Sequence, residues 1–222
     1  MALRLYTYWR SSAAFRVRIA LALKGLDYES VPRHLLRDGG EHRRADYLAL
    51  NPQGLVPALE HDGTVITQSL AICEYLEEVS PRPALLPSSP ADRAVVRAMA
   101  LVVACDVHPL NNLAIMQYLR SELGADDAAV KRWVAHWITR GFVALERWVA
   151  AEAGSQPAAD QKFCHGGQVS LADVCLVPQM YNARRFDVDA APYPRLQAIC
   201  RHLESIPAFA AARPEAQPDA EK

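Results

Sequence analysis

The first eighty residues contain short runs in which the spacing of hydrophobic positions changes between that of a strand and that of a helix. Residues 3–8, LRLYTY, alternate apolar and polar side chains, which predicts a short strand. Apolar side chains then recur at helical spacing over residues 13–24, and Gly25 is a suitable end for that helix. Residues 27–33, DYESVPR, predict a second strand, and Pro32 indicates that it lies at a sheet edge.

The region continues with a helix, a hairpin and another helix. GGEHRRADYLAL, residues 39–50, predicts a short helix. Residues 56–68 hold two strand-like runs around Asp62-Gly63, a pair typical of a tight hairpin. Ser69 opens the last helix as its N-cap or as an adjacent residue. The order predicts a parallel βαβ unit and an antiparallel ββα unit, which together form one small mixed sheet covered by helices.

A proline-rich stretch divides the chain. SPRPALLPSSP, residues 80–90, contains four prolines and three serines, which predicts an extended spacer. Beyond it the patterns are helical, and no convincing strand is found. We therefore predict an α/β domain over residues 1–80, a linker over 81–90 and an all-helical domain over 91–222.

Four positions in the helical part predict local features. Pro109 bends or interrupts the first long helical pattern. Ser170 and Asp173 have the spacing of a capping box, with Asp in place of Glu or Gln. The polar, proline-containing end of the chain from Arg213 onward is expected to fray.

The composition is that of a globular protein, with 51% hydrophobic and 22% charged residues. A formal net charge of -1 gives no reason to expect nucleic acid or an acidic membrane surface as a partner. The N-terminus lacks the pattern of a signal peptide, and no run of about 18 apolar residues predicts a membrane span. The five cysteines have no paired spacing, which favours reduced thiols and a cytoplasmic location.

Candidate chemistry begins at Arg10-Ser11-Ser12, where the first strand meets the first helix. A helix N-terminus presents free N–H groups and the positive end of a dipole, so it favours an anion such as a thiolate. A hydroxyl that donates to sulfur lowers the pKa of the thiol further, and Ser11 could be that donor for a cofactor thiol. The alternative is that Ser11 or Ser12 only caps the helix. Thioredoxin-like redox chemistry is disfavoured because no C-x-x-C lies at this turn.

Two more stretches present groups to a ligand. A cis Val56-Pro57 bond would leave the Val56 backbone groups free to pair with an extended peptide, whereas an ordinary trans proline at the start of a strand is the alternative. Gln68 and Ser69 lie at another helix N-terminus, where they could receive a carboxylate or only cap the helix.

Taken together, RSS, FRVRIALALKG, LNPQGLVPAL and QSLAICEYLEE resemble the zeta class of glutathione transferases, which includes maleylacetoacetate isomerases, and the related bacterial maleylpyruvate isomerases. The resemblance continues at HPLNNL, SLADVCLVPQ and RRFDVDAAPYP and covers nearly the whole chain. It implies an N-terminal thioredoxin-like domain (βαβαββα) that binds glutathione, and a C-terminal helical-bundle domain that completes the substrate pocket. It also implies a homodimer.

The resemblance further implies roles for single residues. Ser11 is the serine that stabilises the thiolate. Val56, beside a cis Pro57, pairs with the cysteinyl backbone of glutathione, and Gln68 and Ser69 hold its γ-glutamyl carboxylate. The other residues assigned to the glutathione site are Ser12, Arg16, His42, His108 and Asn112.

Three of these assignments have structural alternatives. Arg16 and Arg18 are two apart on a helix and cannot face the same way. One of them could serve the site, while an ion pair or a solvated surface is the alternative for both. His42 and His108 could equally be structural histidines.

The implied reaction is the cis-to-trans isomerisation of a maleyl-type keto acid, maleylacetoacetate to fumarylacetoacetate, in aromatic amino acid catabolism. The protein must ionise the thiol, hold two acidic ends and stabilise an enolate. Arginines suit the last two tasks because they bind carboxylates with two hydrogen bonds. Arg10, which adjoins Ser11, is the first candidate, followed by Arg185 and its neighbour Arg184.

One departure leaves the substrate open. The zeta pattern reads Ser-Ser-Cys, but this chain has Ala13, and the maleylpyruvate isomerases also lack that cysteine. Arginines after the two asparagines would favour the maleylpyruvate branch, and here those residues are Leu113 and Ala114. The alternatives are therefore a maleylpyruvate isomerase, a glutathione transferase or dehalogenase acting on α-haloacids, and a non-catalytic binding protein. A hydrolase or a metal site is disfavoured, since the chain has neither G-x-S-x-G nor paired His/Cys ligand spacing.

Overall fold

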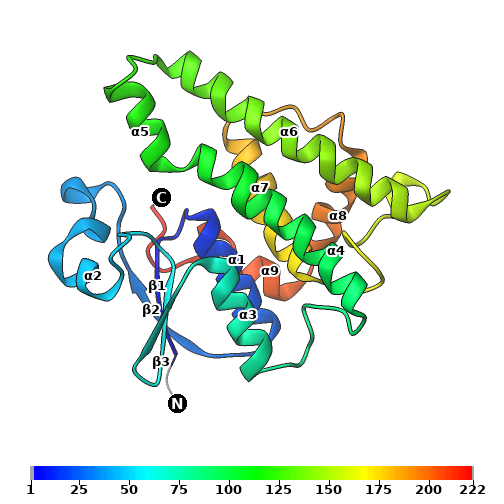
Figure 1. Cartoon of the computed structure of the whole chain (residues 1–222), viewed down its shortest axis with the longest axis horizontal. Coiled ribbons are helices and arrows are strands. Elements are labelled where there is room, and N and C mark those ends of the chain that lie inside the picture. Colours follow the sequence, from blue (N-terminus) through cyan, green and yellow to red (C-terminus); the bar gives the residue numbers. More distant parts are fainter. Residues whose placement is uncertain (1–2, 222) are drawn as a thin grey trace. The chain divides into compact units, whose positions relative to one another are not determined.

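The computed structural model describes residues 3–221 of the chain, and these form two compact units. One unit contains the described residues up to Ala84 together with those from Ile206 onward, and the other is Leu85–Ser205. The first contains the sheet, and the second is helical (Figure 1). The expectation that residues 91–222 form one domain is therefore wrong at its C-terminal end, because helix α9 (Pro207–Ala212) packs on α1 in the first unit.

A four-stranded mixed sheet forms the centre of the first unit, in the order β2-β1-β3-β4. Its strands are β1 (Leu3–Thr7), β2 (Tyr28–Pro32), β3 (Ala58–His61) and β4 (Thr64–Thr67). β1 runs parallel to β2 and antiparallel to β3, which is itself antiparallel to β4. The predicted edge position of β2 and the predicted hairpin at Asp62-Gly63 are both confirmed.

Helices surround this sheet. Those of the first unit are α1 (Ser12–Leu23), α2 (Ala45–Leu50), α3 (Ser69–Val79) and α9, with 3-10 turns at Arg37–Gly39, Glu41–Arg43 and Pro214–Ala216. The single helix expected over residues 39–50 is instead a 3-10 turn followed by α2. Arg44 explains this difference, because its ψ of 150° is extended and separates the 3-10 turn Glu41–Arg43 from α2.

Both faces of the sheet are covered. The alternation along paired strands β1 and β3 places Leu5 and Leu59 on one face, and Tyr6 and Ala58 on the other. Tyr6 and Ala58 join a buried cluster that includes Tyr47 of α2. α1 packs against both α3 and α9 (Figure 1). Its residues from Ala14 to Leu21 are all buried.

The C-terminal stretch expected to fray is ordered up to Glu221. Gln217 Nε2 donates to the carbonyl oxygens of Ala211 and Arg213, at 3.0 and 2.8 Å. These acceptors lie at the end of α9, where helical carbonyls lack partners within the helix. The side chain of Gln217 thus holds the following residues against the first unit.

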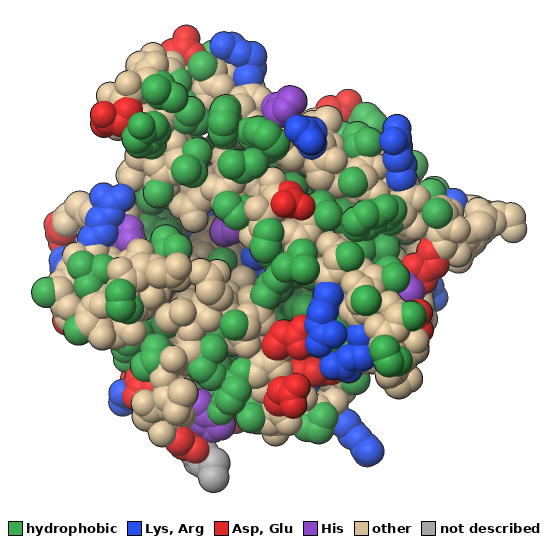
Figure 2. Space-filling model, in the orientation of Figure 1, with side chains coloured by type: hydrophobic (Ala, Val, Ile, Leu, Met, Phe, Trp, Pro, Cys, Tyr) green, Lys and Arg blue, Asp and Glu red, His purple; other side chains and the backbone are tan. Residues whose placement is uncertain are grey.

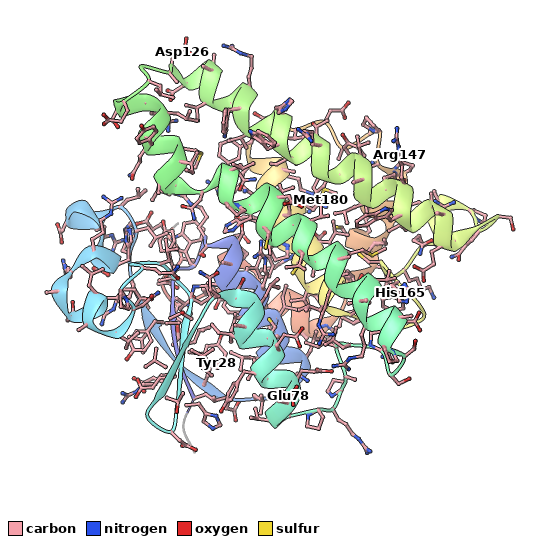
Figure 3. All side chains as sticks on the ribbon, viewed as in Figure 1. Tyr28, Glu78, Asp126, Arg147, His165 and Met180 are labelled. Carbon is pink, nitrogen blue, oxygen red and sulfur yellow. The ribbon has the colours of Figure 1, made fainter. Side chains whose placement is uncertain are left out.

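The second unit is built from helices. They are α4 (Pro90–Leu101), a π-helix (Val102–Val107), a 3-10 turn (His108–Asn111), α5 (Leu113–Ser121), α6 (Asp127–Ala153), a 3-10 turn (Ala158–Asp160), α7 (Leu171–Arg185) and α8 (Pro194–Glu204). The predicted interruption at Pro109 is confirmed. Asp126 caps α6, since its Oδ1 accepts the Ala129 N–H (Figure 3). The predicted capping box of α7 is also confirmed, because Asp173 Oδ2 accepts the Ser170 N–H at 2.8 Å.

One helical stretch is more apolar than the sequence-based expectation allowed. By length and composition alone, Pro90–Ser121 is able to cross a membrane. The core helix of a globular domain passes the same test, and α4 packs against α7 within its unit. Val95, Leu101 and Tyr118 of this stretch are exposed, and Figure 2 shows hydrophobic side chains on the viewed surface of the molecule.

Candidate active site

The turn between β1 and α1 places Ser11 at a helix N-terminus. Ser11 has an extended backbone (φ -70°, ψ 119°) and is the N-cap of α1, where its Oγ accepts the Ala14 N–H at 3.2 Å. The capping interpretation is therefore confirmed. A hydroxyl group is both an acceptor and a donor, so this bond uses an oxygen lone pair and leaves the proton for another acceptor. Ser12 is the first residue of α1 and is buried.

The side chain of Arg18 holds the same turn by hydrogen bonds. Its Nη2 donates to the Trp9 carbonyl oxygen at 2.8 Å, and its Nη1 donates to Thr7 Oγ1 and the Tyr8 carbonyl oxygen at 3.1 and 3.3 Å. Its Nε donates to the Ala212 carbonyl oxygen. Arg18 is 1% exposed, so the solvated-surface interpretation is wrong for this residue. The sequence contained a signal for this role, because an arginine within a continuous apolar helical run must find buried acceptors.

Arg16 is equally buried but is bonded differently. It is 1% exposed, and its Nη1 donates to Ser69 Oγ at 3.1 Å. Its Nε and Nη2 have no hydrogen-bond partner within the described part of the chain. The solvated-surface interpretation is wrong here as well. The buried positive charge of Arg16 instead lies next to Ser69, the first residue of α3. An anion at this helix N-terminus would balance that charge.

Gln68 holds a rare backbone conformation directly before Ser69. It is the N-cap of α3, with φ 70° and ψ 118°. Such a conformation costs a non-glycine residue on the order of 1–3 kcal/mol and is found most often at ligand sites. Its side-chain Nε2 donates to Gln53 Oε1 at 2.8 Å. The residues expected to hold a carboxylate are therefore arranged around one helix N-terminus.

The segment before β3 presents a stretch of backbone. The Val56-Pro57 bond is cis, as the resemblance implied, and the alternative of an ordinary trans proline is wrong. The preceding carbonyl oxygen, that of Leu55, accepts from Tyr47 Oη and from Asn51 Nδ2, each at 2.7 Å. Burial raises the pKa of Tyr47 to about 12, so its hydroxyl remains a donor. Among residues 3–221, neither backbone group of Val56 has a hydrogen-bond partner.

His42 is a buried histidine with one unused ring nitrogen. It is 6% exposed, and its Nδ1 has no partner among the described residues. Burial lowers the pKa of His42 below 6.5, and the charge of Arg43 adds to this effect, while a hydrogen bond to the His34 backbone opposes it. The ring is therefore neutral near pH 7. Gly40 is required beside it, since a Cβ at that position would collide with the imidazole.

Arg10 differs from the two buried arginines. It is partly exposed, and its guanidinium lies 5.2 Å from the centre of the Trp9 ring. The described part of the chain offers it no ion-pair partner. Arg10 therefore combines a position next to Ser11 with a charge that is available to a ligand.

The remaining predicted site residues belong to the helical unit. Asn112 caps α5, since its Oδ1 accepts the Ala114 N–H at 3.1 Å. Arg184 forms an ion pair with Glu204 at 2.6 Å, whereas the Arg185 guanidinium lies 5.7 Å from the centre of the Phe186 ring. His108 begins a 3-10 turn. The roles of these residues toward a ligand remain predictions.

Similarity to known proteins identifies the family. A model of the glutathione S-transferase N-terminal domain matches residues 10–79. A probable maleylacetoacetate isomerase of Vibrio cholerae is 52% identical over 220 residues, which cover 99% of each chain. A solved holo structure of a maleylpyruvate isomerase, described as a bacterial zeta-class glutathione S-transferase, has a TM-score of 0.93 and 45% identity and covers 98% of this chain and 100% of its own. This chain belongs to the zeta class of glutathione transferases.

A further relative was solved with ligands. The maleylacetoacetate isomerase of Methylobacterium extorquens, with bound malonate and GSH, has a TM-score of 0.90 and 41% identity and covers 99% of this chain and 100% of its own. Family membership confirms the fold class expected from the sequence, a thioredoxin-like unit with a helical unit. Within residues 3–221 of this zeta-class chain, no group of three or more His, Cys, Asp or Glu side chains could hold a metal ion.

Proposed function

We propose that the protein is a glutathione-dependent cis–trans isomerase whose substrate is a maleyl-type keto acid, with maleylacetoacetate as the leading candidate. The observation that carries this proposal is Ser11 at the N-terminus of α1, where the capping bond leaves its hydroxyl proton available. The zeta-class relatives that match the chain end to end support it by their names.

Three features of the first unit fit glutathione. Arg16 carries a buried positive charge next to Ser69, which suits the γ-glutamyl carboxylate. The unpaired Val56 backbone suits the cysteinyl peptide groups. The unused Nδ1 of neutral His42 can accept a hydrogen bond or, as the other tautomer, donate one. Each group supplies the interaction that one part of the tripeptide needs.

Ionising the thiol is the task of the α1 N-terminus. Bound glutathione would supply a thiolate nucleophile for reversible addition to a conjugated cis double bond; the resulting single bond would be free to rotate, and loss of the same thiolate would restore the double bond in the trans form. The Ser11 hydroxyl donates to the sulfur anion, and the positive end of α1 stabilises the same charge. Because Ser11 Oγ is already fixed by the Ala14 N–H, little reorganisation is needed to present its proton.

Arginines hold the acidic ends of the substrate and the developing enolate. Arg10 is proposed for this role because its charge is available and it adjoins Ser11. Arg185 and its neighbour Arg184, which forms an ion pair with Glu204, are the next candidates for this role. No thiol is present at Ala13, so the reaction uses the serine donor alone at this turn.

Maleylpyruvate is the second candidate substrate. It is favoured by Ala13, which stands where the zeta pattern has cysteine, and by the likeness to the maleylpyruvate isomerase structure, with its TM-score of 0.93. Maleylacetone and maleylpyruvate, each followed by absorbance with and without glutathione, would separate the two. The better substrate, judged by kcat/KM, names the branch.

The decisive variant is Ser11→Ala. We expect the pKa of the bound glutathione thiol, read from thiolate absorbance, to rise by about one unit, and kcat to fall about tenfold or more. Ser89→Ala is the matched control, because Ser89 is the N-cap of α4 and its Oγ accepts the Asp92 N–H. An unchanged thiol titration in Ser11→Ala would remove the serine from this role.

The alternative functions predict other outcomes in the wild type. Consumption of glutathione in step with product would favour conjugation or dehalogenation, and glutathione binding without turnover of any electrophile would favour a binding protein.

Assembly and location complete the proposal. We propose a homodimer, to which the exposed apolar residues Val95 and Leu101 on α4 could contribute. We also propose a cytoplasmic location, consistent with five free cysteines. Light scattering of the purified protein would measure the molar mass in solution, and a molar mass of one chain would contradict the homodimer.

A further inference from the structure

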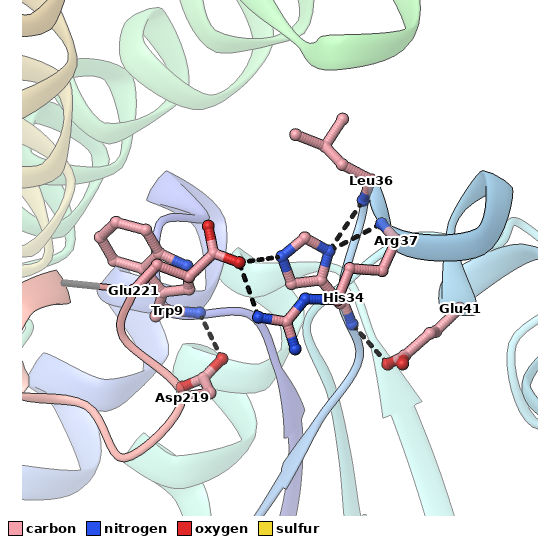
Figure 4. A network of polar contacts seen from close by, with 7 residues as sticks. All are labelled: Trp9, His34, Leu36, Arg37, Glu41, Asp219 and Glu221. Carbon is pink, nitrogen blue, oxygen red and sulfur yellow. Dashed lines mark hydrogen bonds and ion pairs between the residues drawn. The ribbon is translucent and has the colours of Figure 1, made fainter.

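The C-terminal strap, defined here as residues 214–221, reaches the backbone of Trp9 (Figure 4), which lies in the turn before α1. Asp219 Oδ2 accepts the Trp9 backbone N–H at 2.9 Å. Trp9 lies two residues before Ser11, and the Ser11 N–H donates to the Tyr8 carbonyl oxygen at 3.0 Å. A carboxylate near the end of the chain therefore bonds directly to the backbone of the proposed catalytic turn.

The turn is held from two sides. Arg18 donates to the carbonyl oxygens of Tyr8 and Trp9. These bonds fix the acceptors of the turn, while the Trp9 N–H is fixed by Asp219. The strap thus supplies a backbone hydrogen bond to this turn that does not come from α1.

The strap is ordered by its own contacts. Pro214 is buried, and Gln217 bonds to the end of α9. The Ala220 N–H donates to the Gln217 carbonyl oxygen, and Ala220 packs against the cluster that contains Trp9 and Val56. Asp219 therefore lies on a segment with a defined path rather than on a free end.

A second carboxylate fastens the strap beyond Asp219. Glu221 Oε1 lies 3.0 Å from His34 Nε2 and 2.7 Å from Arg37 Nη2 (Figure 4). His34 Nδ1 accepts the N–H groups of Leu36 and Arg37, so Nε2 carries the ring proton and donates to Glu221. These bonds from the loop after β2 hold the strap at Glu221, whereas Gln217 holds it to the end of α9.

We propose that Asp219 is a positioning residue for the proposed isomerase: by accepting the Trp9 N–H, it sets the place from which Ser11 offers its hydroxyl proton. The inference rests on the proposed function of Ser11. Asp219 does not touch the reacting atoms and acts only through the backbone of the turn. A displaced Ser11 donates poorly to a thiolate, because hydrogen bonds weaken steeply with distance and angle.

The direction of the shift in the pKa of the bound thiol distinguishes a positioning effect of Asp219 from the electrostatic effect of its charge. A nearby carboxylate disfavours a thiolate, so loss of the Asp219 charge alone would lower the pKa of the bound thiol. Loss of positioning would raise it. In Asp219→Ala we expect this pKa to rise by about 0.5–1 unit, which at a pH below the pKa reduces the ionised fraction about three- to tenfold. Asp219→Asn keeps an acceptor oxygen and removes the charge, so its thiol pKa should equal or fall below that of the wild type.

A readout without ligand tests the contact itself. In the free enzyme, amide hydrogen exchange at Trp9 should be slow in the wild type and in Asp219→Asn, and at least about tenfold faster in Asp219→Ala. Asp126→Ala is the matched control, because it also removes a bond from a carboxylate to a backbone N–H, but in the helical unit. A chain ending at Gln217 is the second variant, should Asp219→Ala not fold, and it should reproduce the thiol shift.

The outcomes distinguish the two proposals. If Ser11→Ala leaves the bound-thiol pKa unchanged, the proposed role of Ser11 fails, and the positioning role that rests on it fails as well. If Ser11→Ala raises this pKa but Asp219→Ala lowers it or leaves it unchanged, only the positioning role is overturned. Equal pKa increases in Asp219→Ala and Asp126→Ala would also overturn it, since a general loss of stability would then explain both. An increase confined to Asp219→Ala and the shortened chain supports it.

Discussion

Two buried arginines on α1 should respond oppositely to the same substitution. Arg16 and Arg18 are two residues apart and each 1% exposed. Arg18 donates to Ala212 O, Thr7 Oγ1, Tyr8 O and Trp9 O. Arg16 donates to Ser69 Oγ, and its Nε and Nη2 have no partner within residues 3–221. We expect Arg16→Met to preserve the folded protein without ligand and to weaken glutathione binding, and Arg18→Met to destabilise the fold.

The magnitudes follow from these contacts. Each unsatisfied buried donor costs about 1–3 kcal/mol, so Arg16→Met removes a penalty of about 2–6 kcal/mol and loses a charge-assisted bond that contributes about 1.5–3 kcal/mol. The free energy of unfolding without ligand should therefore fall by no more than about 1 kcal/mol and could rise by up to about 4.5 kcal/mol. Arg18→Met leaves buried carbonyls without donors and should cost about 3–5 kcal/mol.

Glutathione binding, unlike the stability of the free protein, should be weakened by Arg16→Met. An attraction between the guanidinium and a carboxylate bound at Ser69 contributes about 2–3 kcal/mol at an effective dielectric constant of about 20. Its loss would weaken glutathione binding roughly 30- to 150-fold. Calorimetric melting with and without glutathione measures both quantities, and Arg16→Lys, which keeps the charge, should recover part of the affinity. The reasoning is refuted if Arg16→Met and Arg18→Met lower the melting temperature equally, or if Arg16→Met retains the full ligand-induced increase.

Two further predictions concern protonation and capping. The pKa of His42 in the folded state lies below its ordinary value of 6.5 in the unfolded chain, so the unfolded chain binds more protons between these two values. The free energy of unfolding therefore falls as pH falls through this range. In His42→Gln the melting temperature should fall less than in the wild type between about pH 7 and pH 5. Asp173 accepts three hydrogen bonds at 2.8 Å, from Cys164 N, Ser170 N and Ser170 Oγ. Asp173→Ala should therefore cost about 3–5 kcal/mol in chemical unfolding. Burial raises the pKa of Asp173, so this difference should shrink as pH rises through the folded-state value, and a difference that grows with pH would contradict this.

The local order of the chain was predictable from short-range patterns. Alternating residues in β1, the helical spacing of α1 and the turn at Asp62-Gly63 each depend on neighbours in sequence. The capping box at Ser170 and Asp173 was found by spacing for the same reason. Ser11 and Gln68 were likewise placed at helix N-termini, because a helix start is a local property.

Contacts between distant segments decided the rest. Arg16 and Arg18 look alike in the sequence, and only the positions of Ser69, Trp9 and Ala212 in space make one an unpaired charge and the other a fixed support. The C-terminal residues have a composition typical of a frayed end, and their order depends on acceptors at α9 and on the Trp9 N–H, 210 residues from Asp219. Periodicity reports which face of an element is apolar, whereas the partner of a buried charge or of a chain end is set by the folded backbone. The sequence by itself therefore determined the elements, the helix N-termini and the candidate thiolate donor, and the tertiary structure alone decided what holds that donor in place.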